Sequence, residues 1–187
     1  MKQFKIFFAG ELFDHKHLTG NYLLAEQLEK ISKKRFRCLL PQNLESNSLS
    51  CDELRKADLE LLFSSDMVLF NFDGGDIDSG TAIEFTICKS LNKPSLLFRS
   101  DFRNAGDQQD GDPWNLMCSG YPGTERLIIN AMEFYKKYKN ESAQKTAESM
   151  YSEIAKLIIK KLDILIPQIK PVKPEILKSL RKSYALD

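Results

Sequence analysis

The sequence lacks the features that mark several common classes of protein. Its four cysteines (Cys38, Cys51, Cys88 and Cys118) are widely spaced and form no C-x-x-C pair. This spacing argues against a disulfide framework and against a zinc site, so we expect reduced thiols. No stretch approaches the roughly 20 apolar residues of a membrane-spanning helix. No apolar signal segment precedes the first predicted strand, so we expect a cytoplasmic protein.

The chain also has almost no net charge. Its 27 Lys and Arg residues balance 26 Asp and Glu residues, which leaves +1 over 187 residues. Nothing in this balance favours nucleic acid or an anionic membrane as a partner. His15 and His17 could be two metal ligands on a polar loop, but the pattern offers no third. We therefore place both at the surface and expect neither a metal nor a cofactor.

Short apolar runs alternate with amphipathic segments along the first half of the chain. The runs predict strands at 4–9, 36–40, 67–72 and 95–98, and the amphipathic segments predict helices at 21–34, 51–63 and 81–91. Strands that are apolar throughout and separated by helices are typical of a parallel sheet covered on both faces. The length suits one such α/β domain.

The sequence changes character after the fourth predicted strand. Residues 99–123 are polar, and a connection of this length predicts a functional lid or a subunit contact. From Glu125 the pattern predicts helix, and residues 143–166 carry an apolar stripe. The tail from Pro167 is expected to leave the helix. We therefore predict an α/β domain at 1–124 and a C-terminal helical extension at 125–187, packed on the domain or in an oligomer interface.

Two carboxylates, Asp78 and Glu84, follow the third predicted strand in the segment Gly74–Glu84. Ligands of open α/β sheets bind at the carboxyl ends of the strands. A carboxylate pair at that edge predicts chemistry at a sugar carbon, with one acid and one nucleophile. Near the start of a helix, Glu84 is expected to stay ionised and so to be a competent nucleophile. Glu11 and Asp14 after the first strand would repel a phosphate, which favours a neutral ligand.

Each of these residues also has a purely structural interpretation. The run from Thr81 to Glu84 fits a capping box, in which the glutamate satisfies the start of a helix. Asp76 and Asp78 fit turn or capping positions. Asp58 falls within an amphipathic helix and fits a solvated or capping position. The residues alone leave these alternatives open.

Several segments together resemble one enzyme family. They are Lys5–Gly10, Ser65–Val68, Asp78–Glu84, Leu91–Pro94, Ser100–Asn104 and Pro113–Met117. Their order and spacing, across about residues 4 to 118, resemble the nucleoside 2-deoxyribosyltransferase family, in particular its kinetoplastid-like branch. The resemblance implies a flavodoxin-like fold of about five strands and transfer of 2-deoxyribose between nucleobases. It also implies a homo-oligomer whose active sites are shared between subunits.

The resemblance assigns roles to individual positions. Glu84 matches the nucleophile that attacks C1′ to give a covalent deoxyribosyl-enzyme, and Asp78 matches the acid that protonates the departing base. Asp58 matches a base contact, and Asn115 matches a residue that reaches the sugar 5′-hydroxyl in the neighbouring subunit. Other positions in the matching segments complete the expected substrate-binding set: Phe7, Gly10, Gly80 and Met117.

The chain departs from the family pattern at two positions and in one region. Phe7 stands where the family carries a tyrosine that hydrogen-bonds the nucleophile, and Glu11 stands where a neutral residue is usual. The region beyond Glu125 has no counterpart. Two alternatives are a hydrolase that uses water as acceptor, and a nucleoside-binding module without catalysis, which Phe7 favours. A phosphoribohydrolase is disfavoured by the extra residues before Gly80.

Overall fold

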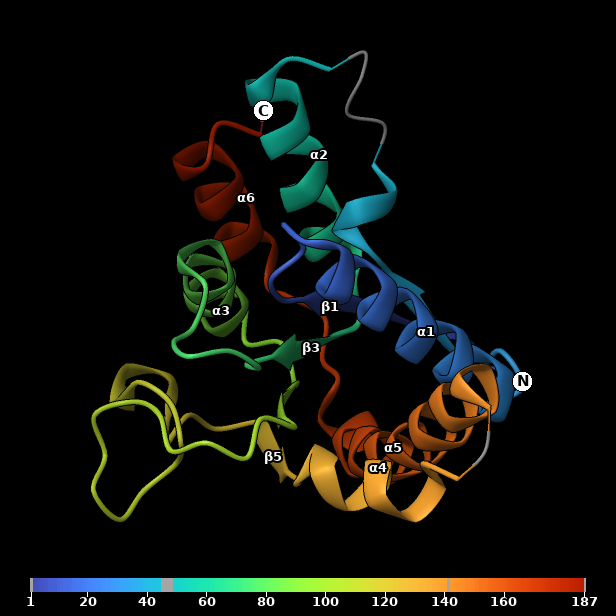
Figure 1. Ribbon diagram of the computed structural model, residues 1–187. Helices are drawn as coiled ribbons and strands as arrows, with labels where there is room; N and C mark the ends of the chain where they lie inside the picture. Colours follow the sequence, from blue (N-terminus) through green and yellow to red (C-terminus); the bar gives the residue numbers. More distant parts are fainter. Residues whose placement is uncertain (1, 45–48, 141, 187) are drawn as a thin grey trace.

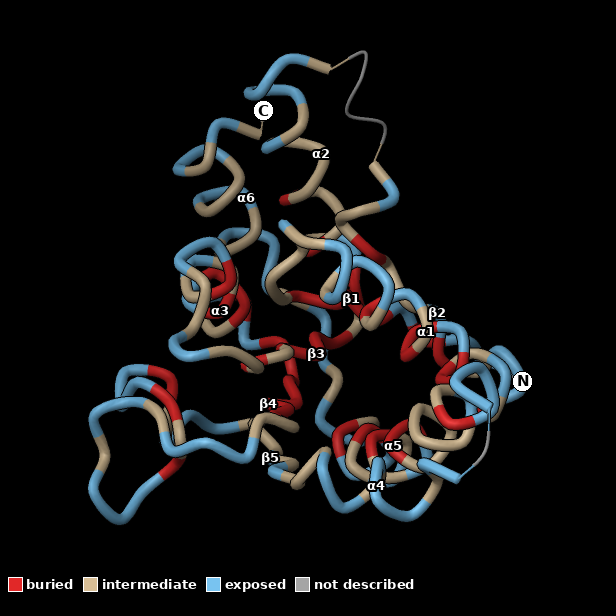
Figure 2. Tube along the Cα trace, in the orientation of Figure 1, coloured by how far each residue is buried: buried red, intermediate tan, exposed pale blue. Residues whose placement is uncertain are grey.

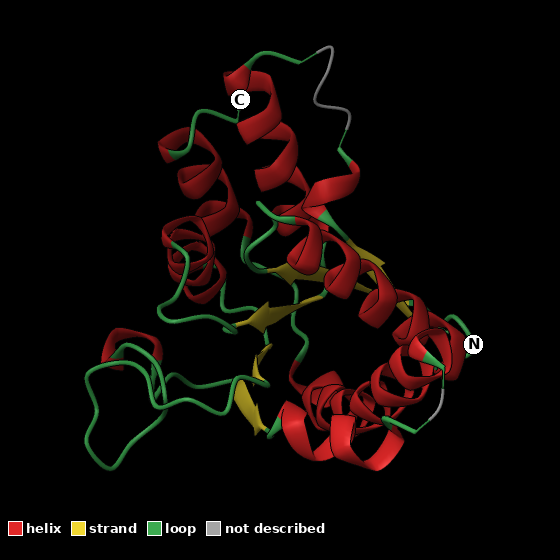
Figure 3. Cartoon of the chain, in the orientation of Figure 1, coloured by secondary structure: helices red, strands yellow, loops and turns green. Residues whose placement is uncertain are grey.

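The protein is built around one five-stranded parallel sheet. The computed structural model describes residues 2–44, 49–140 and 142–186. Its strands are β1 (Phe4–Ala9), β2 (Phe36–Leu39), β3 (Met67–Asn71), β4 (Ser95–Arg99) and β5 (Thr124–Ile128). They lie in the order β2-β1-β3-β4-β5, and every neighbouring pair is parallel (Figure 3). This is the flavodoxin-like order, which confirms the predicted fold and places the switch point between β1 and β3.

Helices and short 3-10 helices connect the strands and continue the chain after β5. They are α1 (His15–Ile31), η1 (Pro41–Asn43), α2 (Cys51–Ser64), α3 (Ser79–Ser90), η2 (Leu116–Cys118), α4 (Ala131–Tyr138), α5 (Ala143–Leu165), η3 (Ile166–Gln168) and α6 (Pro174–Ser183). The first helix begins earlier than predicted because Asp14 caps it. The Asp14 carboxylate accepts hydrogen bonds from the backbone N–H groups of Lys16 (2.8 Å) and His17 (2.9 Å).

The sheet separates two apolar cores. On one face α1 and α5 pack against the side chains of Phe4, Ile6 and Phe8 from β1. On the other face α2 and α3 pack against Phe7 and Ala9, with α6 added at the outside. Figure 2 shows the buried residues gathered along the sheet and on the helix sides that face it. The apolar runs that predicted the strands reflect burial on both faces.

Two elements of the C-terminal region differ from the prediction. Residues 125–128, which were expected to begin a helix, belong to β5, and this edge strand pairs with β4 in the register Ser95 to Thr124. The sheet therefore continues across the expected boundary at 124. The tail was expected to leave the helix, yet α6 forms there, because Pro174 occupies the first helical position, where a missing N–H costs nothing.

The last two long helices cover opposite faces of the sheet. In Figure 1, α5 lies beside α1 and α4, whereas α6 lies beside α2 and α3. The packing agrees, since Ile158 of α5 is in the first core and Leu177 of α6 packs on the second. Within the described residues, no helix is long and apolar enough to cross a membrane.

Candidate active site

At the switch point the chain after β1 approaches the chain after β3 closely. A Cβ added to Gly10 would lie 3.0 Å from the Cβ of Asn71, so glycine permits the close approach of the two strand ends. Asn21 of α1 connects them. Its side-chain amide donates to the Glu11 carbonyl (3.0 Å), and its oxygen accepts from the Asn71 amide (3.4 Å).

Asp78 caps the helix that carries Glu84. Its Oδ2 atom accepts hydrogen bonds from the Thr81 backbone N–H (2.9 Å) and the Thr81 hydroxyl (3.2 Å). A Cβ on Gly80 would lie 3.1 Å from the same oxygen. Because α3 begins at Ser79, Glu84 falls in its second turn, beyond the reach of the first orphan N–H groups. The capping-box interpretation of Glu84 is therefore wrong, and the structural interpretation of Asp78 as a cap is confirmed.

Glu84 of α3 and Asp58 of α2 form a half-buried carboxyl pair. Burial raises the pKa of Glu84 to about 9, helped by the negative charge of Asp58 and by a hydrogen bond with its side chain. The charge of Asp78 adds to this shift. Burial also raises the pKa of Asp58, whose Oδ1 atom is buried without a hydrogen-bond partner among the described residues. Because two close carboxyls cannot easily ionise together, the raised pKa of Glu84 favours its neutral form at neutral pH.

The protonated state of Glu84 corrects the expectation that the helix start would keep it ionised. A helix terminus stabilises a charge by roughly 0.3–1 kcal/mol, and the effect fades beyond the first turn. Each unit of pKa shift corresponds to about 1.4 kcal/mol, so the loss of solvent and the neighbouring carboxylates outweigh the helix by several-fold. The raised pKa therefore favours a proton on the candidate nucleophile itself.

Phe7 lies on the same face of the sheet as this pair. Its side chain is fully buried in the core formed with α2 and α3. The ring offers no hydroxyl, so the hydrogen-bond partner of Glu84 comes from Asp58 on α2 instead of from β1.

The comparisons with known proteins identify the family. A model of the nucleoside 2-deoxyribosyltransferase family matches residues 6–117, more than half of the chain. The chain belongs to this family. The match spans β1 to β4, the carboxyl pair and the loop that follows β4. A comparison with curated proteins finds no match.

Solved structures share the fold. A conserved protein from Enterococcus faecalis V583 is 26% identical, with a TM-score of 0.55 over 70% of this chain and 93% of its own. A 2-desoxiribosyltransferase from Leishmania mexicana is 21% identical, with a TM-score of 0.53 over 74% of this chain and 98% of its own. A 2-deoxyribosyltransferase from Bacillus psychrosaccharolyticus is 20% identical, with a TM-score of 0.50 over 76% and 95%.

Asn115 and Met117, which the family resemblance places at the substrate, lie on the loop between β4 and β5. Figure 1 shows this loop projecting from the sheet. Asn115 is exposed and caps η2, where its side chain accepts a hydrogen bond from the Met117 N–H (3.0 Å). Met117 is 68% exposed and Leu116 is 51% exposed. No hydrogen bond or ion pair of the described residues joins this loop tip to Glu84.

A buried brace that the sequence analysis missed joins the loops after β3 and β4. Arg99 is fully buried, and its guanidinium donates to the carbonyls of Phe72 and Gly74 (2.9 Å for Gly74). In return the Asp73 carboxylate accepts from the Ser100 hydroxyl (2.7 Å) and the Asp101 N–H (2.8 Å). The only signal in the sequence was an arginine that ends an otherwise apolar strand. The brace fixes the chain that leads to Asp78.

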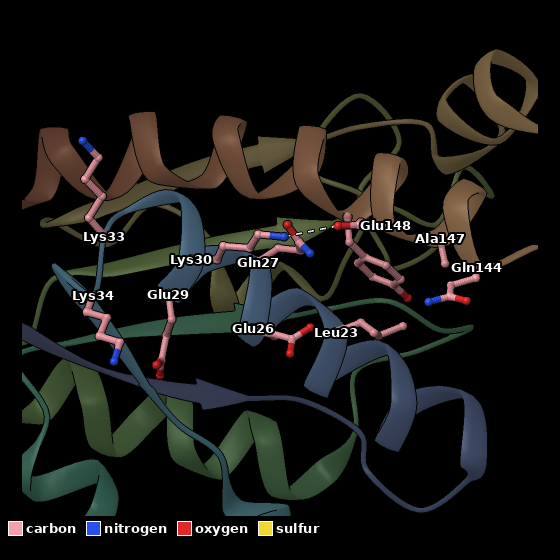
Figure 4. Close-up of a pocket in the computed structure, with 11 residues that line it drawn as sticks. Leu23, Glu26, Gln27, Glu29, Lys30, Lys33, Lys34, Gln144, Ala147 and Glu148 are labelled. Atoms are coloured by element: carbon pink, nitrogen blue, oxygen red, sulfur yellow. Dashed lines mark hydrogen bonds and ion pairs between the residues drawn. The ribbon is translucent and has the colours of Figure 1, made fainter. Parts of the chain in front are cut away.

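Other hollows lie away from the carboxyl pair. A cleft of about 900 Å³ lies along the contact between α1 and α5 and is lined by residues of both helices (Figure 4). Its lining mixes both signs of charge, and the ion pair between Lys30 and Glu148 (3.2 Å) spans it. It contains none of the predicted site residues. In the described part of the chain, no group of three or more His, Cys, Asp or Glu side chains could hold a metal ion.

Proposed function

We propose that this member of the family exchanges the base of a 2′-deoxyribonucleoside through a covalent intermediate on Glu84. The observation that supports the proposal is the Asp58–Glu84 pair, two neighbouring carboxyls on α2 and α3 whose burial raises the pKa of both. Base exchange needs a carboxylate to attack the sugar and a proton to release the base. One buried pair with one proton provides both.

The proposed reaction begins with transfer of the shared proton to Asp58. The Glu84 carboxylate then forms a bond to C1′ as the bond from C1′ to the base nitrogen breaks. The base leaves with that electron pair and takes the proton from Asp58, so charge is balanced. An incoming base attacks C1′, expels Glu84 and returns a proton to the pair. Asp78 uses Oδ2 in the helix cap, and we assign its other oxygen to the departing base.

A base-exchange assay tests this proposal. The protein is incubated with a 2′-deoxyribonucleoside and a second base, and the new nucleoside is quantified by chromatography. Glu84→Ala should abolish exchange while keeping the thermal transition, and Glu148→Ala, at an exposed position on α5, is the control. A deoxyribosyl adduct should appear by mass spectrometry on the wild-type protein only. Full activity in Glu84→Ala would refute the mechanism, and free deoxyribose formed without an acceptor base would identify a hydrolase.

We further propose that Asn115 serves the active site of a second subunit. Asn115 lies on the loop between β4 and β5, beside the exposed apolar side chains of Leu116 and Met117. Mixing Glu84→Ala with Asn115→Ala should restore part of the activity that each variant lacks alone, because mixed oligomers contain one intact site. A homo-oligomer in light scattering is the expected companion result. Absence of restored activity in a proven mixed oligomer would contradict the shared site.

A further inference from the structure

A second cleft lies at the end of the sheet opposite the carboxyl pair. It measures about 800 Å³ and is bounded by the last turn of α3, the residues before β4 and β5, and the segment 167–173 that leads into α6. Pro94 and Gly123, which precede β4 and β5, line it, so it faces the amino ends of these strands. Clefts of this volume are typical of small-molecule sites.

The charge of this cleft is of one sign. Four lysines line it: Lys89, Lys93, Lys170 and Lys173. None of its described lining residues is Asp or Glu. The whole chain carries a net charge of only +1, so this excess is local. Lys93 is buried and turned toward the carbonyls of Phe63 (3.1 Å) and Ser65, which leaves three lysines to face a ligand.

Lys89 has only uncharged hydrogen-bond partners. Its amine donates to the hydroxyls of Ser95 and Thr124 (2.7 Å for Thr124), which are register partners in β4 and β5. Burial lowers the pKa of Lys89, as expected for an ammonium that has lost water without gaining a carboxylate. An ammonium has three donors, so one remains for a ligand. An anion in the cleft would give the Lys89 ammonium the negatively charged partner that it lacks.

The start of α6 opens onto the same cleft. Lys173 is the N-cap residue, and no side chain caps the helix there. Ile176 from the first turn lines the cleft. The backbone N–H groups of this turn and the positive end of the helix therefore add to the lysines.

We propose that this cleft is a binding site for a phosphorylated small molecule, with its phosphoryl groups on Lys89, Lys170 and Lys173. Phosphate carries several negative charges and acceptor oxygens, which matches separate lysine amines that act as point charges. The cleft is separate from the carboxyl pair, so the proposal stands whether or not the chain exchanges bases.

Calorimetric titration with inorganic tripolyphosphate tests the proposal. Wild-type protein should show saturable binding that weakens with added salt. Lys170→Glu/Lys173→Glu should weaken binding by about tenfold or more, because two attractive charges become repulsive. The matched control is Lys136→Glu/Lys139→Glu, which makes the same charge change at exposed positions on and after α4. Base exchange should be unchanged in both double variants.

A second pair of variants examines the buried amine. Lys89→Met should weaken tripolyphosphate binding, whereas Lys89→Arg should keep most of it. A deoxynucleoside triphosphate, titrated in parallel with tripolyphosphate and with the unphosphorylated nucleoside, separates a nucleotide ligand from phosphate alone. Equal losses in the two double variants would show non-specific attraction to the net charge. That result, or no saturable binding to the folded wild-type protein, would overturn the proposal.

Discussion

The two ends of α3 bury charged groups in opposite ways. In its second turn, Glu84 loses solvent together with Asp58 of α2, and burial raises the pKa of both carboxyls. At its end, Lys89 and Lys93 lose solvent but keep uncharged hydrogen-bond acceptors, namely hydroxyls and carbonyls. In both places burial moves the pKa toward the neutral form. The carboxyl end is therefore suited to moving a proton, and the lysine end is suited to attracting an anion.

Glu84→Gln should have the largest effect on the carboxyl end. Loss of the nucleophile should lower base exchange by about 10⁴-fold or more. Tripolyphosphate binding at the lysine end should stay the same, as measured by calorimetry. A parallel loss of base exchange and of tripolyphosphate binding would show that the carboxyl pair and the lysine cleft act as one site.

The same substitution should change how stability depends on pH. Glu84 has a folded pKa of about 9 against an ordinary value of 4.5, so the folded state retains a proton that the unfolded state releases. Stability of the wild-type protein should therefore fall as pH rises from 4.5 to 9, by about 2 kcal/mol or more relative to Glu84→Gln. Urea unfolding at pH 5, 7 and 9 measures this difference. Parallel curves for the two proteins would contradict the buried proton.

Asp58→Asn should reduce kcat by about 10²- to 10³-fold, since it removes the proposed proton carrier. It also removes a neighbouring charge, so the pKa of Glu84 should fall and the alkaline limb of the pH–rate profile should move to lower pH. Asp52→Asn at the exposed start of the same helix is the control. An unshifted alkaline limb would show that the charge of Asp58 does not affect the pKa of Glu84.

Arg99→Met should destabilise the protein by about 3 kcal/mol, because the carbonyls of Phe72 and Gly74 lose their buried donor. We expect a smaller, roughly tenfold loss of kcat/KM, since the loop to Asp78 loses its brace. The control is Arg103→Met, which removes an exposed guanidinium from Asp101. Thermal unfolding measures the loss of stability, and steady-state kinetics measure the loss of kcat/KM.

Phe7→Tyr should have the smallest effect. It tests whether a hydroxyl at position 7 can hydrogen-bond the Glu84 carboxylate. A hydroxyl at this buried position that reaches Glu84 would stabilise its ionised form. Exchange should then rise about two- to fivefold at neutral pH, with a lower alkaline pKa. A stability loss of about 1 kcal/mol without a change in the pH profile would show that the hydroxyl stays unpaired.

The central strands could be predicted because burial on both faces makes them apolar throughout, whereas their flavodoxin-like order was implied by the family resemblance. β5 was missed for the opposite reason. It is an edge strand, and Glu125 and Arg126 interrupt its apolar pattern. The α6 helix was missed because Pro171 and Pro174 suggested a break, although proline is compatible with a first turn. Local patterns therefore revealed the core of the sheet better than its edge or its covering helices.

Sequence patterns proposed the site residues but could not indicate their electrostatics. The strand-loop-helix pattern located Asp78 and Glu84 at the correct edge of the sheet. The spacing within one segment could not show that Asp58 from α2 lies against Glu84, because that proximity depends on how two helices pack on the sheet. For the same reason the protonation of Glu84 could not be predicted, since it depends on Asp58 and on burial.

The position of α5 has a consequence for the synthesis of the chain. This helix covers the face formed by Phe8, Leu96 and Phe98, yet it is made only after all five strands. A ribosome-bound chain that has not reached Leu165 carries every predicted catalytic group but leaves that apolar face open to water or to a chaperone. A polypeptide that stops where the family match ends, at residue 117, should therefore aggregate.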